Sequence, residues 1–96
     1  MLIDCHCHLS FPDYAEDLET VVNGLNSTFY AVIESTINPE NTQTALRSLS
    51  KYRLIHFALG FHPYYAAECT DEILKEYAKT IGENKRIVAI GEIGLD

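Results

Sequence analysis

The stretch from residue 29 to residue 60, "FYAVIESTINPENTQTALRSLSKYRLIHFALG", has the pattern of a strand, a helix and a second strand. Residues 29–35 and 54–60 are rich in β-branched and aromatic side chains, which predicts two strands. Between them, Asn38 can cap a helix whose first position is Pro39. The apolar positions that follow have helical spacing: Ala45, Leu46, Leu49 and Tyr52.

The same alternation precedes this unit. Residues 1–5 are expected to form a short strand. A helix should then start within "FPDYAED" (residues 11–17), because Asp13 and Glu16 have the spacing of a capping box. Its buried positions would be Leu18, Val21, Val22 and Leu25.

The alternation also continues after residue 60. Thr70 can cap a third helix, and Gly82 lies where that helix should end. Residues 87–92, "IVAIGE", are expected to form a fourth strand. The apolar side of the third helix would consist of Ile73, Leu74, Tyr77, Ala78 and Ile81.

Repeated β-α units predict the α/β class with a parallel sheet, built either as an open doubly wound sheet or as a TIM-like (β/α) barrel. No glycine-rich turn follows the first strand, which weakens the dinucleotide-binding version of the doubly wound fold. A full barrel takes about 250 residues. We therefore expect residues 1–96 to form a single segment equal to about half of a barrel. Such a segment could be a fragment, a truncated gene product or a half barrel that associates with itself.

Composition narrows the class of protein. The formal net charge of -7 argues against a general DNA-binding module, although bound cations can reverse the local sign in a nuclease. Three cysteines are an odd number and predict no disulfide scaffold. With no signal peptide and no membrane-spanning stretch in view, a cytoplasmic location is expected.

Three stretches with unusual residues follow predicted strands: "DCHCHL" (residues 4–9), "GFHPY" (60–64) and "GEIGLD" (91–96). In parallel β/α proteins the functional groups gather at the carboxyl ends of the strands. The topology should therefore bring His6, His8, His62 and Glu92 to one rim.

Strict strand alternation would divide the first of these stretches into two faces, with Asp4, His6 and His8 on one and Ile3, Cys5, Cys7 and Leu9 on the other. The set with the cysteines is expected to pack under the helices, and the polar set to face the barrel interior. Two imidazoles and a carboxylate then suit Zn, Mn, Ni or Fe, and Mg less well.

Taken together, "DCHCHL", "LGFHPYY" and "IGEIGLD" resemble the N-terminal part of the TatD family of metal-dependent hydrolases. The resemblance implies a distorted β/α barrel that hydrolyses phosphodiesters, with many members described as DNases or as exonucleases acting on DNA or RNA. It implies one or two divalent metal ions held by His6, His8 and Glu92. His62 would contact the nucleic-acid substrate, and Asp4 and Asp96 would support the site from outside the ligand set.

The same resemblance places the remaining metal ligands and the catalytic aspartate beyond Asp96. No catalytic residue is therefore expected within this segment, and the isolated chain should be inactive or nearly so. Two alternatives stay open at this point. One is an amidohydrolase-like enzyme acting on C–N or ester bonds, which shares the two histidines but has no role for "GEIGLD". The other is a truncated module that catalyses nothing.

Overall fold

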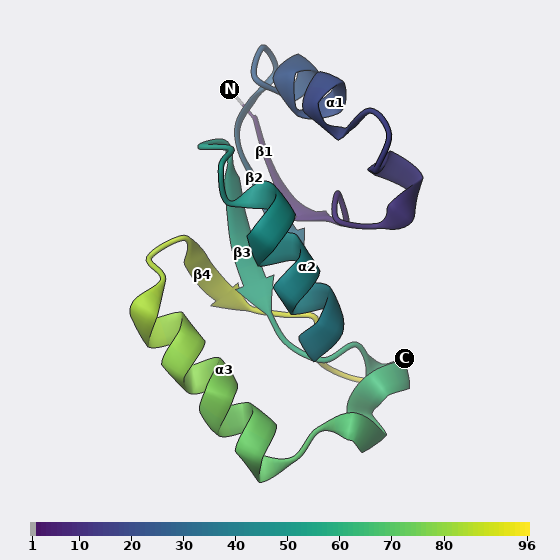
Figure 1. Cartoon of the computed structure of the whole chain (residues 1–96), viewed down its shortest axis with the longest axis vertical. Helices are drawn as coiled ribbons and strands as arrows, with labels where there is room; N and C mark the ends of the chain where they lie inside the picture. Colours follow the sequence, from purple (N-terminus) through teal and green to yellow (C-terminus); the bar gives the residue numbers. More distant parts are fainter. Residues whose placement is uncertain (1) are drawn as a thin grey trace.

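The computed structural model describes residues 2–96 and shows strands alternating with helices along the chain (Figure 1). The strands are β1 (Leu2–Cys7), β2 (Phe29–Ser35), β3 (Ile55–Leu59) and β4 (Ile87–Ile90). The helices are α1 (Leu18–Leu25), α2 (Pro39–Leu49) and α3 (Asp71–Glu83), with short 3-10 helices η1 (Pro12–Tyr14) and η2 (Pro63–Glu68). The predicted order of elements is confirmed.

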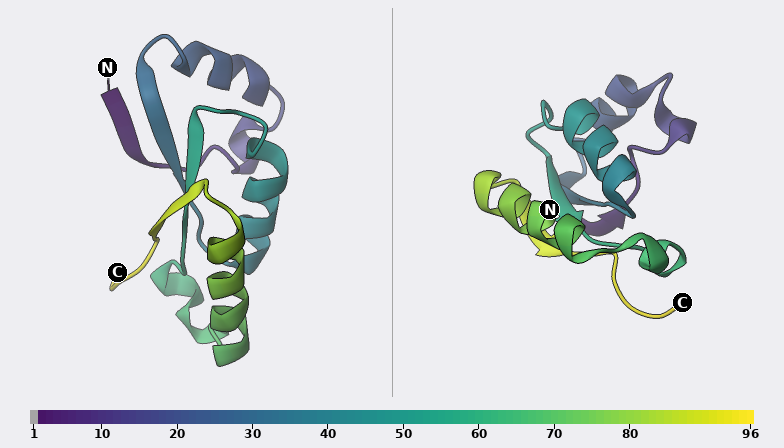
Figure 2. Two further views of the ribbon diagram at one scale, coloured as in Figure 1. Left: turned by 90° about the vertical axis from the view of Figure 1, so that its left-hand side faces the viewer. Right: turned by 60° about the horizontal axis from the view of Figure 1, so that its bottom comes forward.

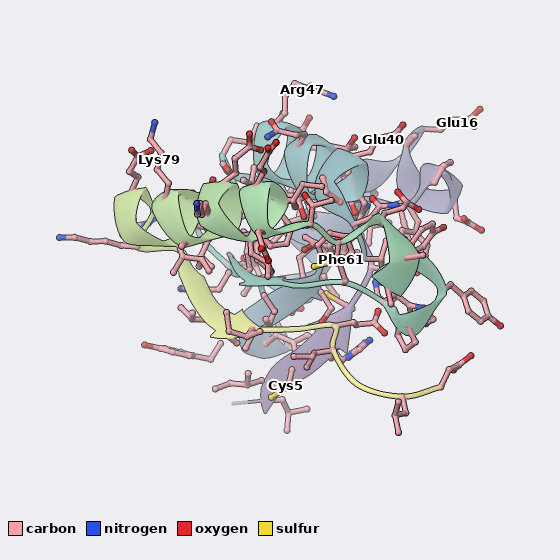
Figure 3. The ribbon with its side chains drawn as sticks, turned by 90° about the horizontal axis from the view of Figure 1, so that it is seen from below. Cys5, Glu16, Glu40, Arg47, Phe61 and Lys79 are labelled. Atoms are coloured by element: carbon pink, nitrogen blue, oxygen red, sulfur yellow. The ribbon has the colours of Figure 1, made fainter. Side chains whose placement is uncertain are left out.

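All strand pairs are parallel, and the strands lie in the order β1-β2-β3-β4. The helices lie on one side of this sheet (Figures 2 and 3). A doubly wound sheet reverses its strand order and carries helices on both faces. The sequential order with one covered face is that of a β/α barrel, so the partial barrel is confirmed and the open doubly wound sheet is excluded.

The core lies between the sheet and the helices. Val22 of α1, Leu49 of α2 and Phe57 of β3 are among its fully buried side chains. Burial of such side chains is the main contribution to the stability of the fold. The opposite face of the sheet, which corresponds to the barrel interior, is left open, and Ile3 of β1 and Ile90 of β4 are exposed.

The start of the first helix differs from the sequence-based expectation. Residues 12–14 form a 3-10 helix, and α1 begins only at Leu18, after Asp17. The backbone N–H groups of Tyr14 and Ala15 bond to carbonyls three residues back, which is 3-10 geometry. The capping box of Asp13 and Glu16 is therefore wrong, because no α-helix starts where it would act.

The other two helices start as expected. The Asn38 side chain accepts a hydrogen bond from Asn41 N–H, and Thr70 accepts one from Ile73 N–H. The third helix continues one residue past Gly82, to Glu83, because Asn84 is the residue that leaves the helical conformation.

Within residues 2–96, β1 and β4 each have a neighbouring strand on only one side. The expected self-association of the half barrel stays a prediction, which light scattering of the purified chain at increasing concentration would test. No helix of the described residues is both long and apolar enough to cross a bilayer.

Candidate metal centre

The carboxyl ends of β1 and β4 bring a pair of histidines, His6 and His8, next to the carboxylate of Glu92, which lies more than 80 residues later in the sequence. His8 Nε2 lies 3.2 Å from Glu92 Oε2, and His6 Nε2 lies 3.5 Å from the same oxygen. The two Nε2 atoms are 3.2 Å apart. The expected ligand trio is therefore assembled in one place.

These separations match what a metal ion requires. Zn–N and Zn–O bonds of about 2.0–2.1 Å place neighbouring ligands of a tetrahedral ion roughly 3.3 Å apart. One donor atom from each of His6, His8 and Glu92 fits a single ion at that spacing, with all three ligand atoms within 4.8 Å of one another. The donor set of two nitrogens and one oxygen suits zinc and other borderline divalent metals.

His8 is held with its metal-facing nitrogen free. Its Nδ1 lies 2.9 Å from the carbonyl oxygen of Ser35, which can only accept a hydrogen bond. Nδ1 therefore carries the hydrogen, and the lone pair of Nε2 points toward Glu92. Phe11 stacks on the same imidazole, with ring centroids 4.6 Å apart, and fixes its plane.

His62 takes the opposite tautomer. Its Nδ1 accepts a hydrogen bond from Tyr64 N–H at the start of η2. In the neutral ring the hydrogen is then on Nε2, which lies 3.8 Å from Glu92 Oε1. This tautomer suits a hydrogen-bond donor to a bound anion and not a metal ligand.

Glu92 is positioned by backbone packing at the ends of three strands. Gly91 N–H bonds to Leu59 O, and Glu92 N–H bonds to Thr36 O. A Cβ atom on Gly60 would lie 2.3 Å from the carbonyl oxygen of Glu92, so only glycine lets these two segments pack this closely. The first residue of "GFHP" therefore serves to place the glutamate of "GEIGLD".

The faces of β1 differ from the sequence-based prediction. Asp4 pairs with Val32 and Cys7 pairs with Glu34, so three steps along β1 match two steps along β2. This is the geometry of a β-bulge, in which an extra residue breaks the alternation of faces. Asp4 and Cys7 therefore lie on the same face, the helix side, although strict alternation would put them on opposite faces. The carboxylate of Asp4 accepts a hydrogen bond from His6 N–H within the bulge.

The predictions for Cys5 and Ile3 are also wrong. Both were expected to pack under the helices, but both are exposed on the open face, where Cys5 lines a cavity together with His6 and Ile33. Figure 3 shows Cys5 on the side of the sheet away from the helices. Cys7, in contrast, packs against the hydrophobic core as expected.

Asp96 is exposed, and no hydrogen bond or ion pair within residues 2–96 involves it. A supporting role for Asp96 therefore stays a prediction, whereas Asp4 has an observed contact with the backbone of His6, one of the expected ligands.

The sequence analysis missed Glu34, whose side chain is 0% exposed. Its carboxyl group accepts hydrogen bonds from Leu9 N–H at 2.6 Å, from Ser10 N–H at 3.0 Å and from the Ser10 hydroxyl at 2.5 Å. Burial raises the pKa of Glu34, and these hydrogen bonds oppose the rise. Glu34 thereby holds the turn that follows His8. A charged residue within the apolar strand "FYAVIES" was the signal available in the sequence.

Cys7 makes stability depend on pH. Burial, and then the nearby carboxylates of Glu34 and Asp4, raise the pKa of Cys7 to about 12 from 9.0. Between these values the unfolded thiol has lost its proton and the folded one has not, so rising pH favours unfolding. We expect the free energy of unfolding of the native chain to fall across this range relative to that of Cys7→Ala. Urea titrations at several pH values, under reducing conditions, measure the difference. Parallel curves for the two proteins would contradict the prediction.

Comparison with known proteins agrees with this geometry. Residues 3–96 match the family model described as TatD related DNase. The chain is 35% identical over 98 residues to the uncharacterized metal-dependent hydrolase YabD of Bacillus subtilis, and 34% identical over 104 residues to human deoxyribonuclease TATDN3. The crystal structure of the TatD homologue YjjV from Escherichia coli superposes with a TM-score of 0.84 at 30% identity and covers 99% of this chain.

The chain spans 38% of the length of YabD, of TATDN3 and of the YjjV structure, while nearly all of its own residues are matched. The likeness therefore extends over the whole segment, including all three motifs at the strand ends. The chain belongs to the TatD family of metal-dependent hydrolases.

Proposed function

We propose that this chain provides the first metal-binding half of a hydrolase that cleaves phosphodiester bonds of nucleic acid. The observation that supports the proposal is the convergence of His6, His8 and Glu92 at the spacing of a metal ion. The similarity to TATDN3, which is named a deoxyribonuclease, supports DNA as the substrate class. The negative charge of the chain does not oppose this, because bound cations provide the local attraction.

A divalent ion at this site would polarise a phosphate oxygen and acidify a bound water. His6, His8 and Glu92 would hold and orient it, while the Nε2–H of His62 would donate a hydrogen bond to a phosphate oxygen. We assign no general base among the described side chains, because the resemblance to the family places the catalytic aspartate outside residues 1–96. We therefore expect the 96-residue chain alone to bind metal with no more than three ligands and to show little or no turnover.

A chimera tests the proposed reaction. In it, this chain replaces the segment of TATDN3 that it matches, so that a complete barrel is present. We expect Mn²⁺-dependent cleavage of labelled single-stranded DNA, and its loss when His6→Ala is introduced. Unmodified TATDN3 and the circular dichroism spectrum of the chimera serve as controls. A folded, metal-binding chimera that leaves DNA intact would contradict the proposal.

The amidohydrolase-like alternative is tested with the same protein. Small amide and lactone substrates should remain uncleaved under the conditions that cleave DNA. Glu92 favours the nuclease, because its carboxylate belongs to the ligand trio, whereas the alternative has no role for the "GEIGLD" stretch that carries it.

A further inference from the structure

A cavity of about 250 Å³ opens directly beside the candidate metal centre. A larger cavity of about 340 Å³ beside α2 is lined by none of the three expected ligands. The wall of the smaller cavity includes His8 and Glu92 of the ligand trio, and His62. Most of the remaining wall is aromatic: Phe11, Tyr64 and Tyr65. We propose that this cavity is a stacking subsite for a nucleobase whose phosphate lies at the metal centre. This proposal rests on the proposed function and adds to it the way in which the substrate is held.

Two rings are placed to form the subsite. Phe11 lies on the imidazole of His8, with an angle of 16° between the ring planes, so its position is tied to a metal ligand. Tyr64 comes from η2, after β3, and its ring meets His62 edge-on with centroids 4.9 Å apart. Tyr64 is 79% exposed, which leaves its ring available to a ligand. Aromatic side chains in such positions are the usual platforms for unpaired bases.

The phosphate is expected beside His62 and Glu92, two residues of the cavity wall whose Nε2 and Oε1 atoms are 3.8 Å apart. A nucleotide with its phosphate there would extend its base toward the rings of Phe11 and Tyr64. Stacking relies on the face of the base and not on its hydrogen-bonding edge. The subsite should therefore accept different bases with similar affinity.

The backbone around Tyr64 allows its side chain to be tested separately. The hydrogen bond that orients His62 comes from the main-chain N–H of Tyr64 and survives replacement of the side chain. Tyr64→Leu therefore removes the ring and its edge-on contact with His62, while the main-chain hydrogen bond that orients His62 is kept. Tyr30, on β2, is 70% exposed and lines none of the cavity, so Tyr30→Leu is the matched control.

The experiment compares two ligands that differ only in the base. The Zn²⁺-loaded 96-residue chain is titrated with deoxyadenosine monophosphate and with deoxyribose phosphate, and binding is followed by calorimetry. We expect the nucleotide to bind about tenfold more tightly, as a stacked base contributes. The advantage should disappear in Tyr64→Leu and in Phe11→Leu and persist in Tyr30→Leu. Nuclear magnetic resonance should show upfield shifts of the adenine protons in the native chain. Zn²⁺ affinity and circular dichroism, measured for each variant, separate loss of stacking from loss of the site.

Equal affinity for the two ligands, or a base advantage that persists in Tyr64→Leu and in Phe11→Leu, would overturn the subsite. If deoxyribose phosphate binds and the base adds nothing, the subsite fails while the phosphate-binding function stands. If the base adds affinity and the chimera leaves DNA intact, the subsite stands and the proposed reaction fails.

Discussion

Replacing His8 by alanine is expected to lower the affinity of the chain for Zn²⁺ by at least about 100-fold. Loss of a supporting group around a metal ligand typically costs 10–100-fold in affinity, and loss of a ligand itself should cost no less. Of the three expected ligands, His8 is the most firmly oriented, because Ser35 O fixes its tautomer and Phe11 fixes its plane. Calorimetric titration of the metal-free chain with Zn²⁺ measures the change.

The matched control for this substitution is His56→Ala. His56 lies within β3, opposite Ile33 of β2, and is not part of the ligand trio. We expect it to leave Zn²⁺ affinity nearly unchanged. Zn²⁺ should also raise the melting temperature of the native chain and of His56→Ala, since it binds the folded state, but not that of His8→Ala. Equal Zn²⁺ affinity in the native chain and His8→Ala would show that the ion does not bind at this site.

Replacing Gly60 by alanine is the second substitution with a large expected effect, although Gly60 touches no metal. Its new Cβ would lie 2.3 Å from Glu92 O and 2.6 Å from the carbonyl carbon of Gly91. Both are backbone atoms, so the segment that carries Glu92 has to move. We expect the free energy of unfolding to fall by roughly 1–3 kcal/mol, as in other overpacked sites. Zn²⁺ affinity should fall about 10-fold or more, because the carboxylate leaves its position.

Gly82→Ala is the control, because nothing lies within 4 Å of a Cβ built on Gly82 of α3. Alanine is favoured over glycine inside a helix by up to about 1 kcal/mol, so this variant should be as stable as the native chain or more so. Urea unfolding and Zn²⁺ titration of both variants provide the comparison. If Gly60→Ala keeps both native stability and native Zn²⁺ affinity, the close packing of Gly60 on Glu92 is not what positions the carboxylate.

The elements that could be predicted were those whose signal is local. The caps at Asn38 and Thr70 depend on a side chain and a backbone N–H three residues later, and both formed. The first helix shows the limit of the same reasoning. Asp13 and Glu16 have the spacing of a capping box, yet a 3-10 turn at Pro12–Tyr14 occupies that segment and the α-helix starts at Leu18.

The β-α repeat, the family and the convergence of His6, His8 and Glu92 could all be predicted from the sequence alone. Periodicity predicts the repeat, and parallel topology sends all strand ends to one rim. Which side chains of "DCHCHL" face that rim depends instead on tertiary contacts between strands. A bulge depends on pairing with β2, so the faces of Asp4 and Cys5 could not be obtained from the alternation of residues in β1 alone. The supporting role of Glu34 and the contact between Gly60 and Glu92 also depend on the tertiary structure. Each of them joins segments that are at least 24 residues apart in the sequence.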